Sequence, residues 1–158
     1  MKKLRVFLDS NVILSGLISD QGAPRLILDV LGLGLPSIQG VTGRFNLTEI
    51  ERNIARKIPA VFTIFNDCLP KLDLEIVPVP FSEELKPYAG IVDDKDFPVL
   101  ASAMMGRADF FVTGDKKPLS QIAAQNTLSF RALLPGEFLD RVLPDLLAGE
   151  SVETGKDR

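Results

Sequence analysis

The chain has 158 residues, 46% of them hydrophobic, with a net charge of −3 and a pI near 5.0, which fits one ordinary domain that buries its own core. No apolar run approaches the roughly 20 residues of a membrane span, and we expect no signal peptide at the start of the chain. Cys68 is the single cysteine and cannot form an internal disulfide. We therefore expect a cytoplasmic protein without a membrane segment. The complete lack of histidine excludes Ser-His-Asp and Cys-His catalysis and histidine-rich zinc sites.

The first half of the chain predicts a strand followed by helices. The apolar run 4–9 predicts a buried strand that ends at Asp9. Gly22 and Pro24 then separate two segments with apolar residues at helical spacing. The expected elements of this half are a strand at 4–9, helices at 10–18 and 23–34, a weak strand at 36–41, a helix that Thr42 caps and that runs to Lys57, and a helix at 60–69 that Pro70 stops.

The second half of the chain continues the alternation. Pro78 and Pro80 mark its first strand as an edge strand, because proline donates no ladder hydrogen bond. The expected elements are strands at 74–79, at 108–114 and within 127–133, and helices at 98–106, 116–124 and 136–147. This order predicts an α/β protein with a mostly parallel sheet covered on both faces. We expect one domain over 1–148 and a polar, frayed tail over 149–158.

Two acids, Asp9 and Asp115, directly follow predicted strands. Ligands of open α/β sheets gather outside the carboxyl ends of the strands, so we expect both acids on one rim of the sheet. Helix capping is a competing explanation for each of them. As a metal ligand, Asp9 would have Asn11 as a neutral support. Thr113 and Gly114 before Asp115 would allow close approach of the backbone.

Asp96 stands just before Pro98 at the start of a predicted helix, where capping is again the simple explanation. Apolar residues follow it at three, four and seven positions, which places Asp96 over the face of the helix that packs on the core. An inward-facing acid needs a partner, and a cation is a suitable one. Asp93 and Asp94 precede Asp96 in a loop, where we expect both to be solvated. The alternative is that Asp94 contacts the site in a supporting role.

Glu49 lies within the helix expected to end at Lys57, on the same face as Arg52 and Arg56. An exposed, ion-paired stripe would explain this pattern. Alternatively, Glu49 faces bound metal and the arginines face phosphate. Glu51 is the alternative acid, and the spacing does not separate the two.

Four separated carboxylates in a chain without histidine predict a hard divalent cation held by oxygen atoms. Phosphodiester hydrolysis uses this chemistry, so a nuclease is the leading hypothesis. The low pI counts against a nucleic-acid substrate. Clustered carboxylates lower the pI by themselves, however, and bound cations reverse the local field.

Four segments, in order, resemble the acidic motifs of the PIN domain family: LDSNVILSGL, TEIERNIARKI, DDKDFPVLASAM and ADFFVTGDKKPL. The resemblance covers about residues 4–134, and the order, spacing and flanks are more specific than any one motif. It implies a three-layer α/β/α sandwich and a Mg²⁺- or Mn²⁺-dependent ribonuclease. Many small members, the VapC-like toxins, form the toxin half of a toxin–antitoxin pair. For this chain the resemblance therefore implies an RNA substrate, an antitoxin partner and a homodimer.

The four acids of the family fall on Asp9, Glu49, Asp96 and Asp115. The resemblance implies that the first, third and fourth coordinate one Mg²⁺ or Mn²⁺, and that Glu49 holds a second ion or orients the water. Ile50 matches the aliphatic position of the family and favours Glu49 over Glu51. Asn11 and Thr113 match its supporting positions.

The chain departs from the family pattern at two places. Ser10 stands where threonine is commoner, and Lys117 stands where many members have a further acid, which puts a second metal in doubt. Phe45 is a candidate for base stacking, although a place in the core is the simpler expectation. The basic residues nearest the motifs are candidates for contact with the RNA backbone: Arg44, Arg52, Arg56, Lys116 and Lys117.

Two other classes of protein fit part of the pattern. A PIN-like RNA- or protein-binding module, or a scaffold with a vestigial site, would use the acids as helix caps. A haloacid-dehalogenase-like phosphatase also begins with a strand that ends in aspartate. Such a phosphatase would need a second acid where this chain has Asn11 and a further acid soon after Asp115. The chain has neither of these acids.

Overall fold

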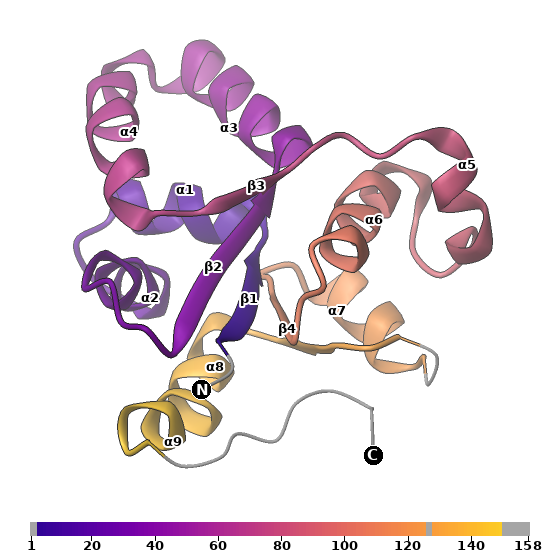
Figure 1. Ribbon diagram of the computed structural model, residues 1–158. Coiled ribbons are helices and arrows are strands. Elements are labelled where there is room, and N and C mark those ends of the chain that lie inside the picture. The colour runs from indigo at the N-terminus through magenta and orange to yellow at the C-terminus, as the bar shows by residue number, and fades with distance from the viewer. Residues whose placement is uncertain (1–2, 126–127, 150–158) are drawn as a thin grey trace.

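The structure, a computed structural model, describes residues 3–125 and 128–149 (Figure 1). Its strands form one parallel sheet in the order β3-β2-β1-β4-β5, which confirms the predicted parallel sheet and the edge position of β3. The strands are β1 (Leu4–Leu8), β2 (Ile38–Gly43), β3 (Glu75–Val77), β4 (Phe110–Val112) and β5 (Arg131–Leu133). Most of the tail predicted over 149–158 lies outside the described residues, and the domain boundary stays a prediction.

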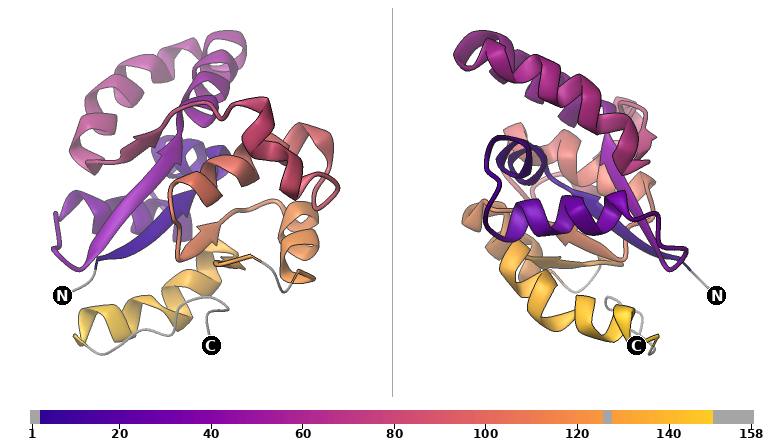
Figure 2. Two further views of the ribbon diagram at one scale, coloured as in Figure 1. Left: turned by 45° about the vertical axis from the view of Figure 1, so that its right-hand side comes forward. Right: turned by 90° about the vertical axis from the view of Figure 1, so that its left-hand side faces the viewer.

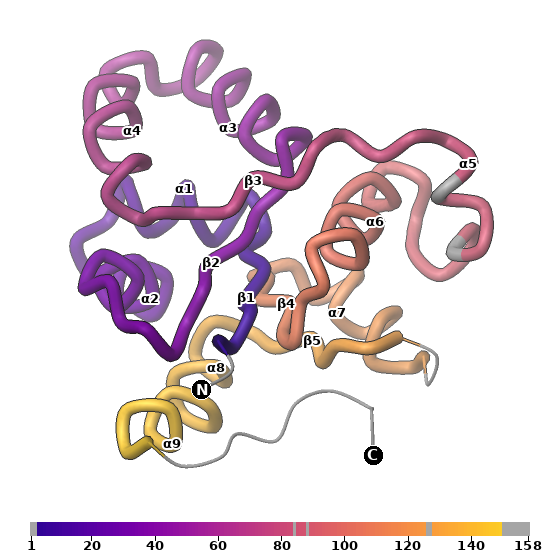
Figure 3. The backbone as a smooth tube through the Cα atoms, in the orientation of Figure 1, coloured from indigo at the N-terminus to yellow at the C-terminus, as the bar shows by residue number. Residues whose placement is uncertain are grey.

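Helices connect the strands in nearly the predicted order (Figure 3). The α-helices are α1 (Ser10–Ile18), α2 (Ala23–Gly32), α3 (Arg44–Lys57), α4 (Phe62–Cys68), α5 (Ser82–Leu85), α6 (Phe97–Met105), α7 (Lys116–Ala123), α8 (Pro135–Arg141) and α9 (Leu143–Leu147). Short 3₁₀ turns are η1 (Pro59–Val61), η2 (Leu69–Leu72), η3 (Lys86–Tyr88) and η4 (Asp94–Asp96).

Two of the predicted helix boundaries are wrong. The single helix expected at 136–147 is divided into α8 and α9, because Pro144 has no N–H to continue the helical ladder. Thr42 does not cap a helix. It lies in β2 and its hydroxyl donates to the carbonyl oxygen of Leu8 at 2.9 Å, while Gly43 occupies the N-cap position of α3.

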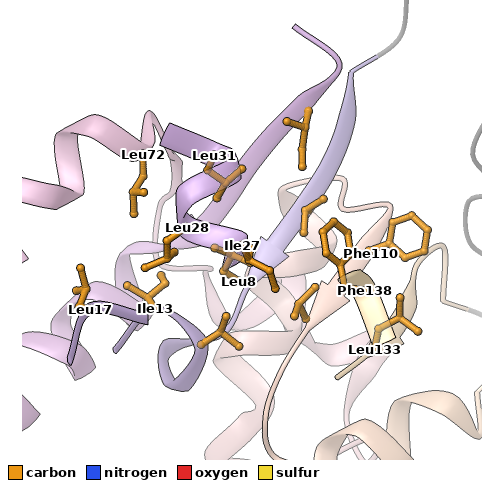
Figure 4. Close-up of a cluster of buried hydrophobic side chains, with 14 of the residues drawn as sticks. Leu8, Ile13, Leu17, Ile27, Leu28, Leu31, Leu72, Phe110, Leu133 and Phe138 are labelled. Atoms are coloured by element: carbon orange, nitrogen blue, oxygen red, sulfur yellow. The ribbon is translucent and has the colours of Figure 1, made fainter. Parts of the chain in front are cut away.

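Apolar side chains on both faces of the sheet form two separate core clusters. In β1, Val6 and Leu8 belong to the first cluster and Phe7 to the second. The first cluster packs against α1, α2, α3, α8 and α9. Figure 4 labels ten of its side chains. Cys68 is half-buried against it, as an apolar residue would be.

The second cluster lies under α6 and α7. Phe7 and Phe111 stack there with ring centroids 5.5 Å apart, against Leu100 and Ile122 of the two helices. The two views of Figure 2 show helices on both sides of the sheet. The three-layer α/β/α sandwich is therefore confirmed. None of the described helices is long and apolar enough to cross a membrane.

The strand order creates one reversal in the middle of the sheet. The chain goes from β1 to β2 and β3 on one side, and then to β4 and β5 on the other, so Val6 pairs with both Gly40 and Phe110. At such a reversal the connections leave the sheet in opposite directions and open a crevice at the carboxyl ends of the strands. Asp9 and Asp115 follow the two strands that border it.

Candidate active site

Asp9 lies at the carboxyl end of β1, at this reversal of the strand order. The residue is 9% exposed, and its carboxylate accepts four hydrogen bonds. The donors are the backbone N–H of Ser10 at 2.7 Å, the Thr113 hydroxyl at 2.8 Å, and the side-chain amides of Asn11 and Asn46 at 3.3 Å each. Asp9 is thus a helix cap, as one explanation predicted, and it is also held in a fixed orientation by groups from three elements.

Burial determines the charge state of Asp9. Desolvation raises the pKa of its carboxyl from 3.8 to about 6, although the hydrogen bonds from Thr113 and Ser10 oppose this change. The charges of Glu49 and Asp96 raise the pKa further. A carboxylate with a raised pKa beside other acids is a favourable place for a cation, which would compensate all of these charges.

Asp96 faces inward, as its position on the helix predicted. It occupies the N-cap position of α6, but its side chain makes no capping hydrogen bond with the described residues, so the capping explanation is wrong. Its Oδ2 atom is buried without any hydrogen-bond partner in the described part of the chain. Asp9 and Asp96 line the same cavity of about 10 Å³, about the size that one water-sized sphere occupies.

The pKa of Asp96 is raised as well. Desolvation is the largest cause and the charge of Lys95 opposes it. The charges of three acids act in the same direction as desolvation: Asp115, Asp93 and Glu49. The charge of Glu49 thus acts on both Asp9 and Asp96.

Asp115 lies at the exposed edge of the site and caps α7 by accepting from the backbone N–H of Lys117 at 3.3 Å. The preceding residues join it to the centre. The N–H of Asp115 donates to the Thr113 hydroxyl at 3.1 Å, and the N–H of Gly114 donates to Asn11 Oδ1 at 2.8 Å. Asn11 and Thr113 therefore hold the ends of β1 and β4 together.

Glu49 is exposed on α3 and makes neither an ion pair nor a hydrogen bond with any described residue. The ion-paired stripe proposed for it is therefore wrong, since Arg52 and Arg56 do not pair with it. Its charge raises the pKa of both Asp9 and Asp96, whereas Glu51 is not among the causes of either change. Of the two acids of α3, Glu49 is the one whose charge acts on both carboxyls, and its role in the site stays a prediction.

The comparisons with known proteins agree with this geometry. A family model described as "PIN domain" matches residues 5–117. The chain belongs to the PIN domain family. Among solved structures it is similar to a chain of "Crystal structure of VapBC2 from Rickettsia felis bound to a DNA fragment from their promoter", with a TM-score of 0.58, 15% identity, and coverage of 83% of this chain and 98% of that chain. At this identity the likeness shows the fold alone. No curated protein matches.

Membership of the PIN family confirms the resemblance and makes the dehalogenase-like alternative wrong. Members of this family generally use divalent metal ions. In this PIN domain, no three acidic or thiol side chains within the described residues are already arranged to hold one ion. The types of donor nevertheless fit Mg²⁺ or Mn²⁺, because the site offers only oxygen atoms and one buried carboxylate oxygen without a partner. The individual metal ligands stay a prediction.

The loop acids of the PIN domain differ from expectation. Asp93 is not simply solvated: it pairs with Lys117 Nζ at 2.7 Å and accepts from Gln121 Nε2 at 3.2 Å. These contacts lower the pKa of Asp93. Asp94 is exposed in η4, and its supporting role stays a prediction.

Exposed basic residues flank the acids. Phe45, in contrast, is half-buried and packs against the second core cluster, as the simpler expectation had it. Lys117, one of the five candidates for contact with the RNA backbone, pairs with Asp93. The other four are exposed and have no ion pair within the described residues: Arg44, Arg52, Arg56 and Lys116. Their role in binding stays a prediction.

Asn46 is the residue of the site that sequence reasoning missed. It is fully buried in the first turn of α3, and its side-chain amide donates to Ser10 Oγ at 2.9 Å as well as to Asp9. Gly43 leaves the space for it, since a Cβ there would lie 2.8 Å from Asn46 Oδ1. An asparagine just after the strand that neighbours β1 was the only signal in the sequence.

Proposed function

We propose that this PIN domain is a divalent-metal-dependent ribonuclease that hydrolyses RNA phosphodiester bonds. One observation carries the proposal. Two carboxylates far apart in sequence, Asp9 after β1 and Asp96 in η4, line one small cavity, and the buried Oδ2 of Asp96 has no partner among the described residues. A buried carboxylate oxygen without a partner is costly in a folded protein, so its retention favours a role in binding a cation.

Asp9, Asp96 and Asp115 would hold one Mg²⁺ or Mn²⁺, and Glu49 would hold a second ion or orient the attacking water. When bound, such an ion lowers the pKa of water and stabilises charge on phosphoryl oxygens, so the chain needs no histidine. Thr113 and Asn11 keep Asp9 in place through their hydrogen bonds.

The exposed edge of the site suits an extended anionic substrate. Arg44, Arg52 and Arg56 extend along α3 from the end of β2, and Lys116 stands beside Asp115. Their positive charges would contact the backbone of single-stranded RNA and compensate the repulsion between phosphate and the acids.

A toxin role in the cytoplasm, with an antitoxin and a homodimer as protein partners, is part of this proposal. It is supported by the PIN family and by the similarity of the fold to a chain of VapBC2.

Cleavage of a mixed single-stranded RNA pool with Mn²⁺ tests the activity. Wild type is compared with Asp96→Asn and with Asp140→Asn, which changes an exposed acid of α8. We expect cleavage by wild type and Asp140→Asn, and a loss of about 100-fold or more in Asp96→Asn. Equal cleavage by all three would indicate a contaminating nuclease. RNA binding without cleavage would favour the non-catalytic binding module.

A further inference from the structure

A second cavity, of about 320 Å³, opens beside the acid site. Its walls come from α1, from the loop after β4 and from the first turns of α2 and α8. The volume is at the lower end of the range for pockets that bind small molecules. It therefore fits one nucleoside rather than a stack of bases.

The cavity and the acid site have a common wall. Asn11 and Asp115 line the cavity, and Asn11 also donates to Asp9 at 3.3 Å. The hydrogen bond of 2.8 Å from the N–H of Gly114 to Asn11 Oδ1 fixes this wall. A group in the cavity is therefore separated from the Asp9 carboxylate by one side chain, that of Asn11. A nucleoside would lie at this place if the phosphate next to it were bound at the acids.

The chemistry of the lining selects a neutral group. No cationic side chain lines the cavity among the described residues, and Asp115 contributes a carboxylate, so a phosphate is disfavoured there. Val12, Pro24 and Pro135 form apolar walls. Ser15 adds an exposed hydroxyl that makes no hydrogen bond with the described residues.

We propose that this cavity binds the nucleoside next to the scissile phosphate of single-stranded RNA and thereby sets the base preference of cleavage. The inference rests on the proposed ribonuclease function and adds a specificity site to it. No aromatic side chain lines the cavity among the described residues, so recognition uses apolar contact and the Ser15 hydroxyl instead of stacking. A base in a duplex cannot enter the cavity, which restricts the substrate to unpaired RNA.

Filling the cavity tests the proposal. Ser15→Phe places a ring in it from an exposed position, and Ser120→Phe is the matched control, an exposed serine of α7 that does not line the cavity. On a randomised RNA pool and on a short oligonucleotide with the preferred sequence, we expect Ser15→Phe to raise KM about tenfold and to change the base preference beside the cut. We expect Ser120→Phe to match wild type in both.

Binding of labelled RNA hexamers, measured by fluorescence anisotropy without metal, separates this proposal from the ribonuclease proposal. Cleavage with an unchanged base preference and KM in Ser15→Phe would overturn the nucleoside site and leave the ribonuclease standing. This outcome would favour a protein segment as the occupant. Wild type that neither cleaves nor binds RNA would overturn both. If Ser15→Phe does not fold, Ser15→Ala replaces it, with a changed base preference as the supporting result and an unchanged one as the opposing result.

Discussion

The Thr113 hydroxyl donates a hydrogen bond of 2.8 Å to Oδ2 of Asp9, across 104 positions of sequence. It joins the ends of β4 and β1 at the reversal of the strand order. Both residues are buried, so the bond is shielded from water. It also opposes the rise in the pKa of Asp9.

Thr113→Val removes this bond and keeps the shape of the side chain. We expect Mn²⁺ affinity to fall about tenfold at pH 6 and less at pH 8, because the pKa of Asp9 rises further. Thr42→Val is the matched control, since its equally buried hydroxyl donates to a backbone carbonyl. It is expected to lose about 1 kcal/mol of stability without a change in Mn²⁺ affinity. Calorimetric titration measures the Mn²⁺ affinity of both variants. Equal affinities in the two would contradict this role of Thr113.

The pH dependence of metal-free stability tests the burial of Asp9. A pKa raised from 3.8 to about 6 means that the ionised carboxylate costs the fold up to about 3 kcal/mol at pH 7. Its favourable contribution is fully present below about pH 3.8 and is lost as the pH rises through about 6. Asp9→Asn is therefore expected to melt higher than wild type at pH 7.5, with a difference that shrinks towards pH 4. A difference that is constant between these values would show that Asp9 does not titrate in this way.

Substitution of the two acids of α3 identifies the helical acid of the site. Glu49→Gln is expected to weaken Mn²⁺ binding or cleavage about tenfold, because Glu49 acts electrostatically on Asp9 and Asp96. Glu51→Gln, also exposed and two positions away, is the control and should behave as wild type. The Mn²⁺ affinity and the cleavage rate are measured for both variants. A larger loss in Glu51→Gln than in Glu49→Gln would identify Glu51 as the acid of the site.

Lys117 places a fixed positive charge beside the acids through its pair with Asp93. Lys117→Met is expected to tighten Mn²⁺ binding roughly threefold at low salt, with a smaller effect at high salt. Lys71→Met, at an exposed position in η2, provides the control. Unchanged affinity at low salt would show that Lys117 lies electrostatically outside the site.

The strand ends were the predictable part of the site. Parallel strands bring their carboxyl ends to one rim, so the sequence alone placed Asp9 and Asp115 together. The inward direction of Asp96 followed from helical spacing. Asn46 and the pair of Asp93 with Lys117 were not predictable, since both depend on contacts between elements far apart in sequence.

Local ambiguity explains the remaining errors. Thr42 is a good capping residue, yet the strand continues through it, because its hydroxyl bonds to the neighbouring strand. Proline is suited to the first turn of a helix, and it also interrupts a helix that precedes it. Pro144 does both here, because it ends the run of α8 and stands in the first turn of α9.

Calorimetric titration of Mn²⁺ into wild type and Asp96→Asn at pH 7.5 tests the central claim most directly, because Asp96 Oδ2 is a buried carboxylate oxygen without a hydrogen-bond partner among the described residues. We predict saturable binding to wild type and binding at least roughly tenfold weaker in the variant. Equal binding by both proteins, or no binding by folded wild type, would contradict a metal site built on Asp9 and Asp96.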